Sequence, residues 1–247
     1  MAAESDFHRH LASVRHAHDE VLAVLDRMPD DGFSGASRLP GWTRAHVAAH
    51  LAHNAEGFGR LATWAATGVE TPMYASVGAR EADIEATTRK RPADLRAAVA
   101  RASNRLVEQL EVLPTAALDV EVHGLFPPAF PAALLPWQRV RECWVHVVDL
   151  DAGVGFEHLP ADIAAALLDE AAARSVARGV DPPLLLVDTG SDRRWALGAG
   201  DGTANNTVRL TGDRAALVGW LTGRGPTDAL ECTGTPPAPP PPPPQWP

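Results

Sequence analysis

Three side chains from two distant segments of the sequence could together hold a metal ion. His50 closes the segment LPGWTRAHVAAH at residues 39–50, and Glu142 and His146 stand four residues apart within RECWVHVVDLD at residues 141–151. Two imidazoles and one carboxylate form a ligand set for a divalent transition metal and leave one coordination position open. These residue types favour a metal-dependent enzyme as the leading hypothesis.

The first ligand candidate belongs to a predicted helix at about residues 43–67, which Thr43 can cap at its start and Gly68 at its end. His50 lies at the edge of the apolar stripe of this helix, beside Asn54. A lone histidine in such a place is more often a hydrogen-bonded core residue than a ligand. Two further histidines of the helix, His46 and His53, turn away from the stripe and are expected at the surface.

The second pair, Glu142 and His146, projects from one face of a predicted helix at about residues 136–151. The strongest apolar face of this helix carries Val140 and Trp144 and lies roughly opposite the pair. Taken alone, the pattern indicates a solvent-exposed contact between residues four apart. A metal site requires that both faces of the helix be covered, so spacing alone does not decide between the two interpretations.

The elements around these residues indicate a helical bundle followed by a smaller unit. Long helices are expected at about 5–28, 43–67, 77–113, broken or kinked near Pro92, and 136–151, with strand-like residues at 118–122 and a proline-rich loop at 127–136. Four long helices with helix-to-helix connections are typical of a bundle. We therefore assign residues 1–154 to a helical, metal-binding domain.

The pattern changes after Gly153. A helix at about 160–178 is followed by three short strands, at 184–187, 194–197 and 207–210, and by a short helix at 215–221. We expect a smaller α+β domain at residues 155–235, which makes the fold class α+β. Residues 236–247 are nearly all proline and are expected to form a disordered, extended tail.

Composition excludes several classes of partner. The formal net charge of −9 argues against nucleic-acid binding, which needs clustered Lys and Arg. No apolar segment is long enough to span a membrane, and the start of the chain does not resemble a secretory signal. Cys143 and Cys232 stand far apart and in no metal-ligand spacing, which fits a reducing compartment. We expect a cytoplasmic protein without membrane contact.

Three segments resemble those of the mycothiol-dependent maleylpyruvate isomerases of the DinB-like superfamily. They are GWTRAHVAAHL from Gly41, TGVETPMYAS at residues 67–76, and the Arg141–Asp149 segment, and the resemblance covers residues 5–230. It implies a DinB-like four-helix bundle with a C-terminal α+β domain similar to sterol-carrier folds. It also implies that His50, Glu142 and His146 bind Zn²⁺, or another divalent transition metal.

The resemblance further implies a reaction and its participants. Mycothiol would supply a thiolate that adds to the cis double bond of maleylpyruvate, and rotation and elimination would give fumarylpyruvate. Arg224 matches an arginine of the family's C-terminal domain that contributes to the active site, although the sequence alone fits a surface arginine equally well. Arg80 and Tyr74 could bind the dicarboxylate substrate. Candidates for orienting the ligands are Glu70, Asp149 and Asp151.

Two other functions remain open at this stage. The same metal and thiol could serve another mycothiol-dependent transferase, which would consume the thiol rather than return it. A non-catalytic protein that binds a ligand or a partner would need neither the metal nor the thiol. A metallohydrolase is disfavoured, because the sequence has no His-Glu-x-x-His segment.

Overall fold

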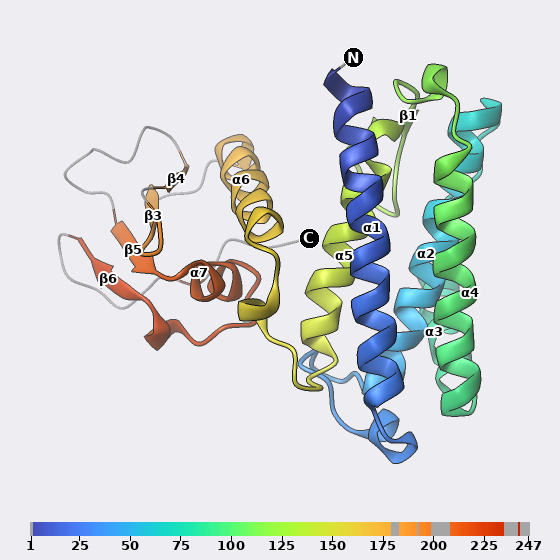
Figure 1. The fold of residues 1–247 in the computed structure, drawn as a ribbon, viewed down its shortest axis with the longest axis horizontal. Coiled ribbons are helices and arrows are strands. Elements are labelled where there is room, and N and C mark those ends of the chain that lie inside the picture. The colour runs from blue at the N-terminus through green and yellow to red at the C-terminus, as the bar shows by residue number, and fades with distance from the viewer. Residues whose placement is uncertain (1, 179–182, 192, 199–207, 235–241, 243–247) are drawn as a thin grey trace. The chain divides into compact units, whose positions relative to one another are not determined.

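The computed structural model describes residues 2–178, 183–191, 193–198, 208–234 and 242. The chain divides into two compact units, Met1–Gly153 and Val154–Pro247, with the division one residue before the expected boundary. Helices occupy most of the first unit, and the second combines helices with a sheet (Figure 1). The predicted fold class, α+β with an N-terminal helical domain, is therefore confirmed.

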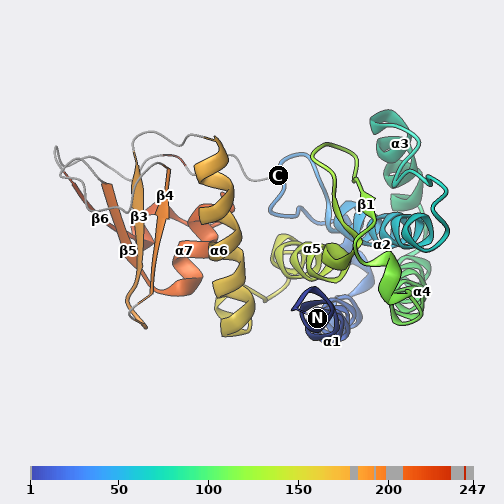
Figure 2. The ribbon, with the colours of Figure 1, turned by 90° about the horizontal axis from the view of Figure 1, so that it is seen from above.

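Four helices build the bundle of the first unit. They are α1 (Ala2–Arg27), α2 (Arg44–Thr67), α4 (Pro92–Glu111) and α5 (Leu135–Asp149). Helices α1 and α2 each pack against both α4 and α5, and α3 (Val77–Thr88) packs on α2 outside the four (Figure 2). Their shared core is apolar and fully buried, and it includes Val14, Leu25, Leu51, Leu61, Leu95, Leu106, Leu135 and Val140.

Local signals set the ends of the helices that carry the candidate site. The ring of His46 accepts a hydrogen bond from the backbone N–H of Thr43 at 3.1 Å and closes the first turn of α2. Gly68 ends α2 in the left-handed region, at φ 71°, where a glycine has no steric cost. The expected break near Pro92 separates α3 from α4, because the residue before a proline prefers an extended backbone.

The connection between α4 and α5 differs from the expectation. A 3-10 turn at Thr115–Ala117 continues into a turn at residues 118–119, so of the expected strand at 118–122 only β1 (Glu121–Val122) is extended and paired. Its partner β2 (Phe130–Pro131) lies within the region predicted to be a loop, before the 3-10 turn Ala132–Leu134. The ladder is short because a proline in β2 cannot donate a backbone hydrogen bond.

The second unit is a mixed sheet with two helices on one of its faces (Figure 2). Its elements are α6 (Ala161–Arg178), β3 (Leu184–Asp188), β4 (Arg194–Leu197), β5 (Val208–Gly212), α7 (Arg214–Leu221) and β6 (Glu231–Thr233), with 3-10 turns at Phe156–His158 and Thr227–Ala229. The strand order is β4-β3-β5-β6, with β3 and β5 parallel and the outer pairs antiparallel. Likeness to sterol-carrier folds stays a prediction.

Two expectations fall on parts of the chain that the structure does not describe. Thr207, the expected first residue of the third strand, and all of the proline-rich tail except Pro242 lie outside the described residues. No helix among the described residues is long and apolar enough to cross a membrane.

Candidate metal centre

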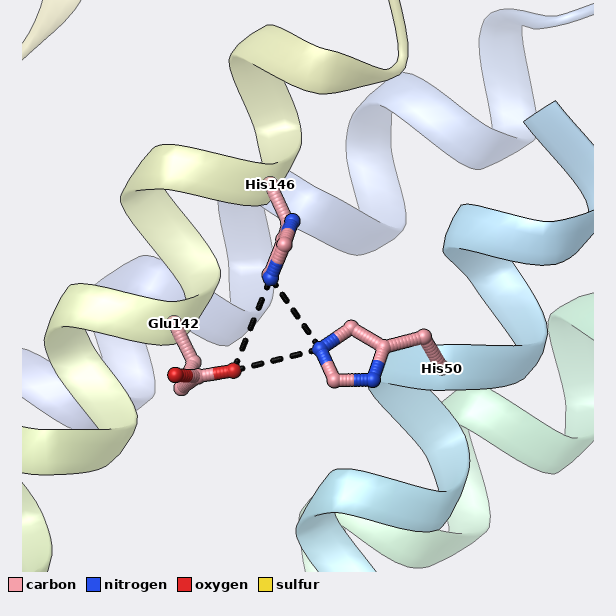
Figure 3. A group of neighbouring side chains, drawn as sticks. All are labelled: His50, Glu142 and His146. Atoms are coloured by element: carbon pink, nitrogen blue, oxygen red, sulfur yellow. Dashed lines mark hydrogen bonds and ion pairs between the residues drawn. The ribbon is translucent and has the colours of Figure 1, made fainter. Parts of the chain in front are cut away.

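Helices α2 and α5 bring His50, Glu142 and His146 together (Figure 3). Nε2 of His50 lies 3.0 Å from Nε2 of His146 and 3.2 Å from Oε2 of Glu142. The candidate ligand atoms of all three lie within 4.8 Å of one another, and the described part of the chain holds no second group of this kind. Two imidazole nitrogens and a carboxylate oxygen suit a divalent transition metal. Their role as ligands remains a prediction.

Glu142 and His146 are largely buried, so the solvent-exposed pair that periodicity alone indicates is wrong. Their side chains are 20% and 14% exposed, and that of His50 is 5% exposed. Helix α5 packs against α1 and α2 and buries apolar side chains on several faces, such as Val145 and Val148. A helix covered on more than one side has no single apolar stripe, and this is why the pattern misplaced the pair.

Asp149 orients the ring of His146. Its Oδ2 lies 2.8 Å from Nδ1 of His146, and the carboxylate is fully buried. A carboxylate accepts the Nδ1 proton and leaves the Nε2 lone pair free to bind a metal, as carboxylates next to metal-binding histidines commonly do. Glu70 and Asp151, the other two carboxylates considered for this role, pair with His123 at 3.6 Å and with Arg38 at 3.2 Å instead.

A buried guanidinium supports Glu142 through one intermediate side chain. Arg139 is fully buried and donates to Oδ1 of Asn54 at 2.7 Å. The amide nitrogen of Asn54 in turn donates to Oε2 of Glu142 at 3.0 Å. Arg139 also donates to Nε2 of His18 at 3.0 Å and to Oγ of Ser103 at 3.4 Å. One side chain thus connects α5 with α1, α2 and α4, and it fixes the orientation of the Asn54 amide.

Sequence reasoning missed Arg139, although the sequence carries a signal for it. Arg139, Glu142 and His146 follow one another at spacings of three and four residues, so all three share one face of α5. A cation on the same helix face as two ligand candidates indicates a shared polar interior. Asn54, four residues after His50, repeats the pattern on α2.

Burial and neighbouring charges set the protonation of the three side chains. Burial, together with the adjacent His146, lowers the pKa of His50 to about 4. Burial alone would lower the pKa of His146 too, but its hydrogen bonds to Asp149 and Glu142 raise it. Although burial opposes ionisation of Glu142, the two histidines hold the pKa of this carboxyl well below its usual value. The cluster therefore contains a carboxylate and a neutral His50.

Arg80 and Tyr74, the two substrate-binding candidates, lie beside the cluster. Nη2 of Arg80 lies 3.1 Å from Nδ1 of His50, and its guanidinium lies 5.9 Å from the ring centre of Trp42 and 5.8 Å from that of Tyr74. The Tyr74 hydroxyl is buried, and Arg80 is the side chain that interacts with it. Burial raises the pKa of this phenol, as does Glu142. Both residues therefore present donors next to the candidate ligands.

The remaining candidates lie elsewhere. His46 pairs with Glu85 at 3.2 Å, and His53 bonds Thr87 at 2.9 Å, so both are held against α3 rather than free at the surface as expected. Arg224 follows the C-terminus of α7 in the second unit and donates to the backbone oxygen of Thr222 at 2.7 Å. Its catalytic role stays a prediction.

Comparisons with known proteins agree with this geometry. Residues 14–151 match the family described as mycothiol maleylpyruvate isomerase N-terminal domain. Residues 158–241 match that enzyme's C-terminal domain family and reach into the proline-rich segment. Comparison with curated proteins finds no match.

Two crystal structures resemble the whole chain. One is described as the mycothiol-dependent maleylpyruvate isomerase and the other as a mutant of it with a histidine replaced by alanine. Each is 31% identical in sequence, with a TM-score of 0.87 and coverage of 97% of both chains. Two family matches that together span most of the sequence, and full-length likeness at this identity, show that the chain belongs to the mycothiol-dependent maleylpyruvate isomerase family.

Proposed function

We propose that this protein is a metal- and mycothiol-dependent cis–trans isomerase that converts maleylpyruvate to fumarylpyruvate. Its family and the crystal structures that resemble it over 97% of the chain support this activity. The observation that carries the proposal furthest is the convergence of His50, Glu142 and His146 within 4.8 Å. A binding protein without catalysis would have no need for this cluster.

The three side chains fit Zn²⁺ or another divalent transition metal. Asp149 holds His146 with Nε2 free, and Asn54 fixes one oxygen of Glu142, so two of the three ligands are oriented before any ion binds. When bound, the metal would lower the pKa of a thiol in its open position and hold it as the thiolate. No redox change is needed, which suits zinc.

The chain's own side chains would bind and stabilise the substrate. Reversible addition of a thiolate makes the cis double bond a single bond that can rotate, and it places negative charge on the keto oxygen. The Arg80 guanidinium and the Tyr74 hydroxyl, both donors beside the cluster, would hold a carboxylate or this oxygen. Arg224, from the second unit, is the second cation proposed for the same dianionic substrate.

The experiment is a turnover assay with the purified protein, maleylpyruvate and mycothiol. An isomerase should form fumarylpyruvate only when the thiol is present, and the free thiol should be the same before and after the reaction. Loss of one thiol per substrate would instead identify a mycothiol transferase. Absence of any thiol-dependent reaction would favour a non-catalytic binding protein and contradict the proposal.

A further inference from the structure

Nδ1 of His50, the ring nitrogen that points away from Glu142 and His146, faces a side chain that can only donate hydrogen bonds. Nη2 of Arg80 lies 3.1 Å from Nδ1 of His50, and a guanidinium has no acceptor. Nδ1 must therefore accept, and the proton of the neutral ring lies on Nε2. This is the nitrogen that points at Glu142 and His146.

Binding of a metal through Nε2 requires the opposite tautomer. The ring proton must then lie on Nδ1, where it would face the N–H of Arg80, donor against donor. His146 has no such conflict, since Asp149 accepts its Nδ1 proton at 2.8 Å. One imidazole is thus held in the tautomer that a metal needs, and the other in the tautomer that excludes it.

Arg80 also lies close to two aromatic rings. Its guanidinium carbon lies 5.9 Å from the ring centre of Trp42 and 5.8 Å from that of Tyr74, and Arg80 forms no ion pair with a carboxylate among the described residues. The charge of Arg80 is therefore not neutralised by an ion pair, and it is available to an anion.

We propose that Arg80 couples metal binding to substrate binding. When Nε2 of His50 binds a metal, Arg80 leaves Nδ1, and its freed guanidinium binds a carboxylate of the dicarboxylate substrate. Binding of the carboxylate and binding of the metal then favour each other reciprocally. This inference rests on the proposed function for the identity of the metal and the carboxylate, but its test does not require turnover.

Zinc affinity of two matched variants tests the first half. Arg80→Met and Arg80→Gln both remove the charge, but only the glutamine offers an oxygen that can accept the Nδ1 proton. Because a hydrogen bond of a charged group is lost when zinc binds the wild type, Arg80→Met should bind zinc about 10- to 100-fold more tightly, measured against a competing chelator. Arg80→Gln, whose amide can pair with either tautomer of His50, should also bind zinc more tightly than the wild type. Equal affinity of wild type and Arg80→Met would overturn the tautomer argument.

Nitrogen-15 NMR of the imidazoles observes the tautomer itself. In the metal-free wild type the His50 proton should lie on Nε2, where Glu142 can accept it. A proton on Nδ1 in the metal-free wild type would contradict the proposal, whatever the activity of the protein.

Zinc titrations with and without maleate, a dicarboxylate that lacks the keto group, test the coupling. Maleate should tighten zinc binding to the wild type on the order of tenfold, the usual size of such linkage, and should not tighten it in Arg80→Met. The same response in both proteins would show that the carboxylate does not act through Arg80. If the coupling is present but maleylpyruvate is not turned over, the proposed reaction fails and the role of Arg80 stands.

Discussion

At the scale of single residues, the two imidazoles of the cluster differ in what faces their outer nitrogens. His146 is oriented by the buried carboxylate of Asp149, whereas the outer nitrogen of His50 meets Arg80. Both contacts lie behind the atoms that would bind a metal, so they act on affinity without being ligands. Substitutions of Asp149 or Arg80 can therefore change the zinc affinity without removing a candidate ligand.

Asp149→Asn should weaken zinc binding by roughly 10- to 100-fold, the usual effect of losing a carboxylate behind a ligand histidine. The neutral amide makes the His146 ring less basic and no longer selects its tautomer. Competition with a chromogenic chelator measures the affinity. The control is Asp151→Asn, since Asp151 pairs with Arg38 and is half exposed. Wild-type zinc affinity in Asp149→Asn would mean that Asp149 does not support the site.

At the scale of the elements, the polar interior of the bundle depends on Arg139. This guanidinium of α5 reaches His18 on α1, Asn54 on α2 and Ser103 on α4, and through Asn54 it reaches Glu142. A buried charge with satisfied hydrogen bonds fixes the positions of the four helices relative to one another. Loss of one of its partners lowers the free energy of unfolding. Helix α5, which carries two of the three candidate ligands, is thereby held by the same network that holds the bundle.

His18→Gln should make the bundle less sensitive to acid. Burial, together with Arg139, lowers the pKa of His18 to about 2, so between about pH 6.5 and pH 2 the unfolded chain binds a proton that the folded chain does not. Stability therefore falls as the pH falls below about 6.5, by up to ~1.4 kcal/mol per pH unit for one proton.

Glutamine keeps an acceptor for Arg139 and removes the titrating group. The part of the pH dependence of the free energy of unfolding that comes from His18 should therefore disappear. Urea unfolding at several pH values between 7 and 4.5 measures it. His8→Gln, at an exposed histidine of the same helix, should behave like the wild type. An unchanged slope in His18→Gln would show that His18 is protonated, or exposed, in the folded bundle.

The elements also show where sequence reasoning succeeded and where it could not. Thr43 and Gly68 act within a turn of the helix ends they define, so the bounds of α2 were predictable to a residue. The pairing of Val122 with Phe130 depends on a partner across a proline-rich loop, and no local sequence pattern predicts it. Likewise, the burial of Glu142 depends on packing of α5 against two helices, which periodicity within one helix does not contain.

At the scale of the whole molecule, the family match covers both units, and we propose that Arg224 of the second unit contributes to the activity. Arg224→Ala should reduce turnover by about 100- to 1,000-fold, the usual effect of removing a donor to a developing oxyanion. Arg224→Lys keeps the charge but loses the planar fork, so its turnover should lie between that of the wild type and that of Arg224→Ala. Zinc content should be unchanged in both. Near-normal turnover of Arg224→Ala would leave the second unit without a catalytic residue.

The most direct test of the central claim is stepwise reconstitution of the metal-stripped protein. Zinc alone and mycothiol alone should each give no maleylpyruvate turnover, and together they should restore it in proportion to bound zinc, up to one ion per chain. His50→Ala, with its helical circular dichroism retained, should bind little zinc and stay inactive. Full turnover by the stripped protein, or by His50→Ala, would contradict the assignment of His50, Glu142 and His146 as the metal centre of a thiol-dependent isomerase.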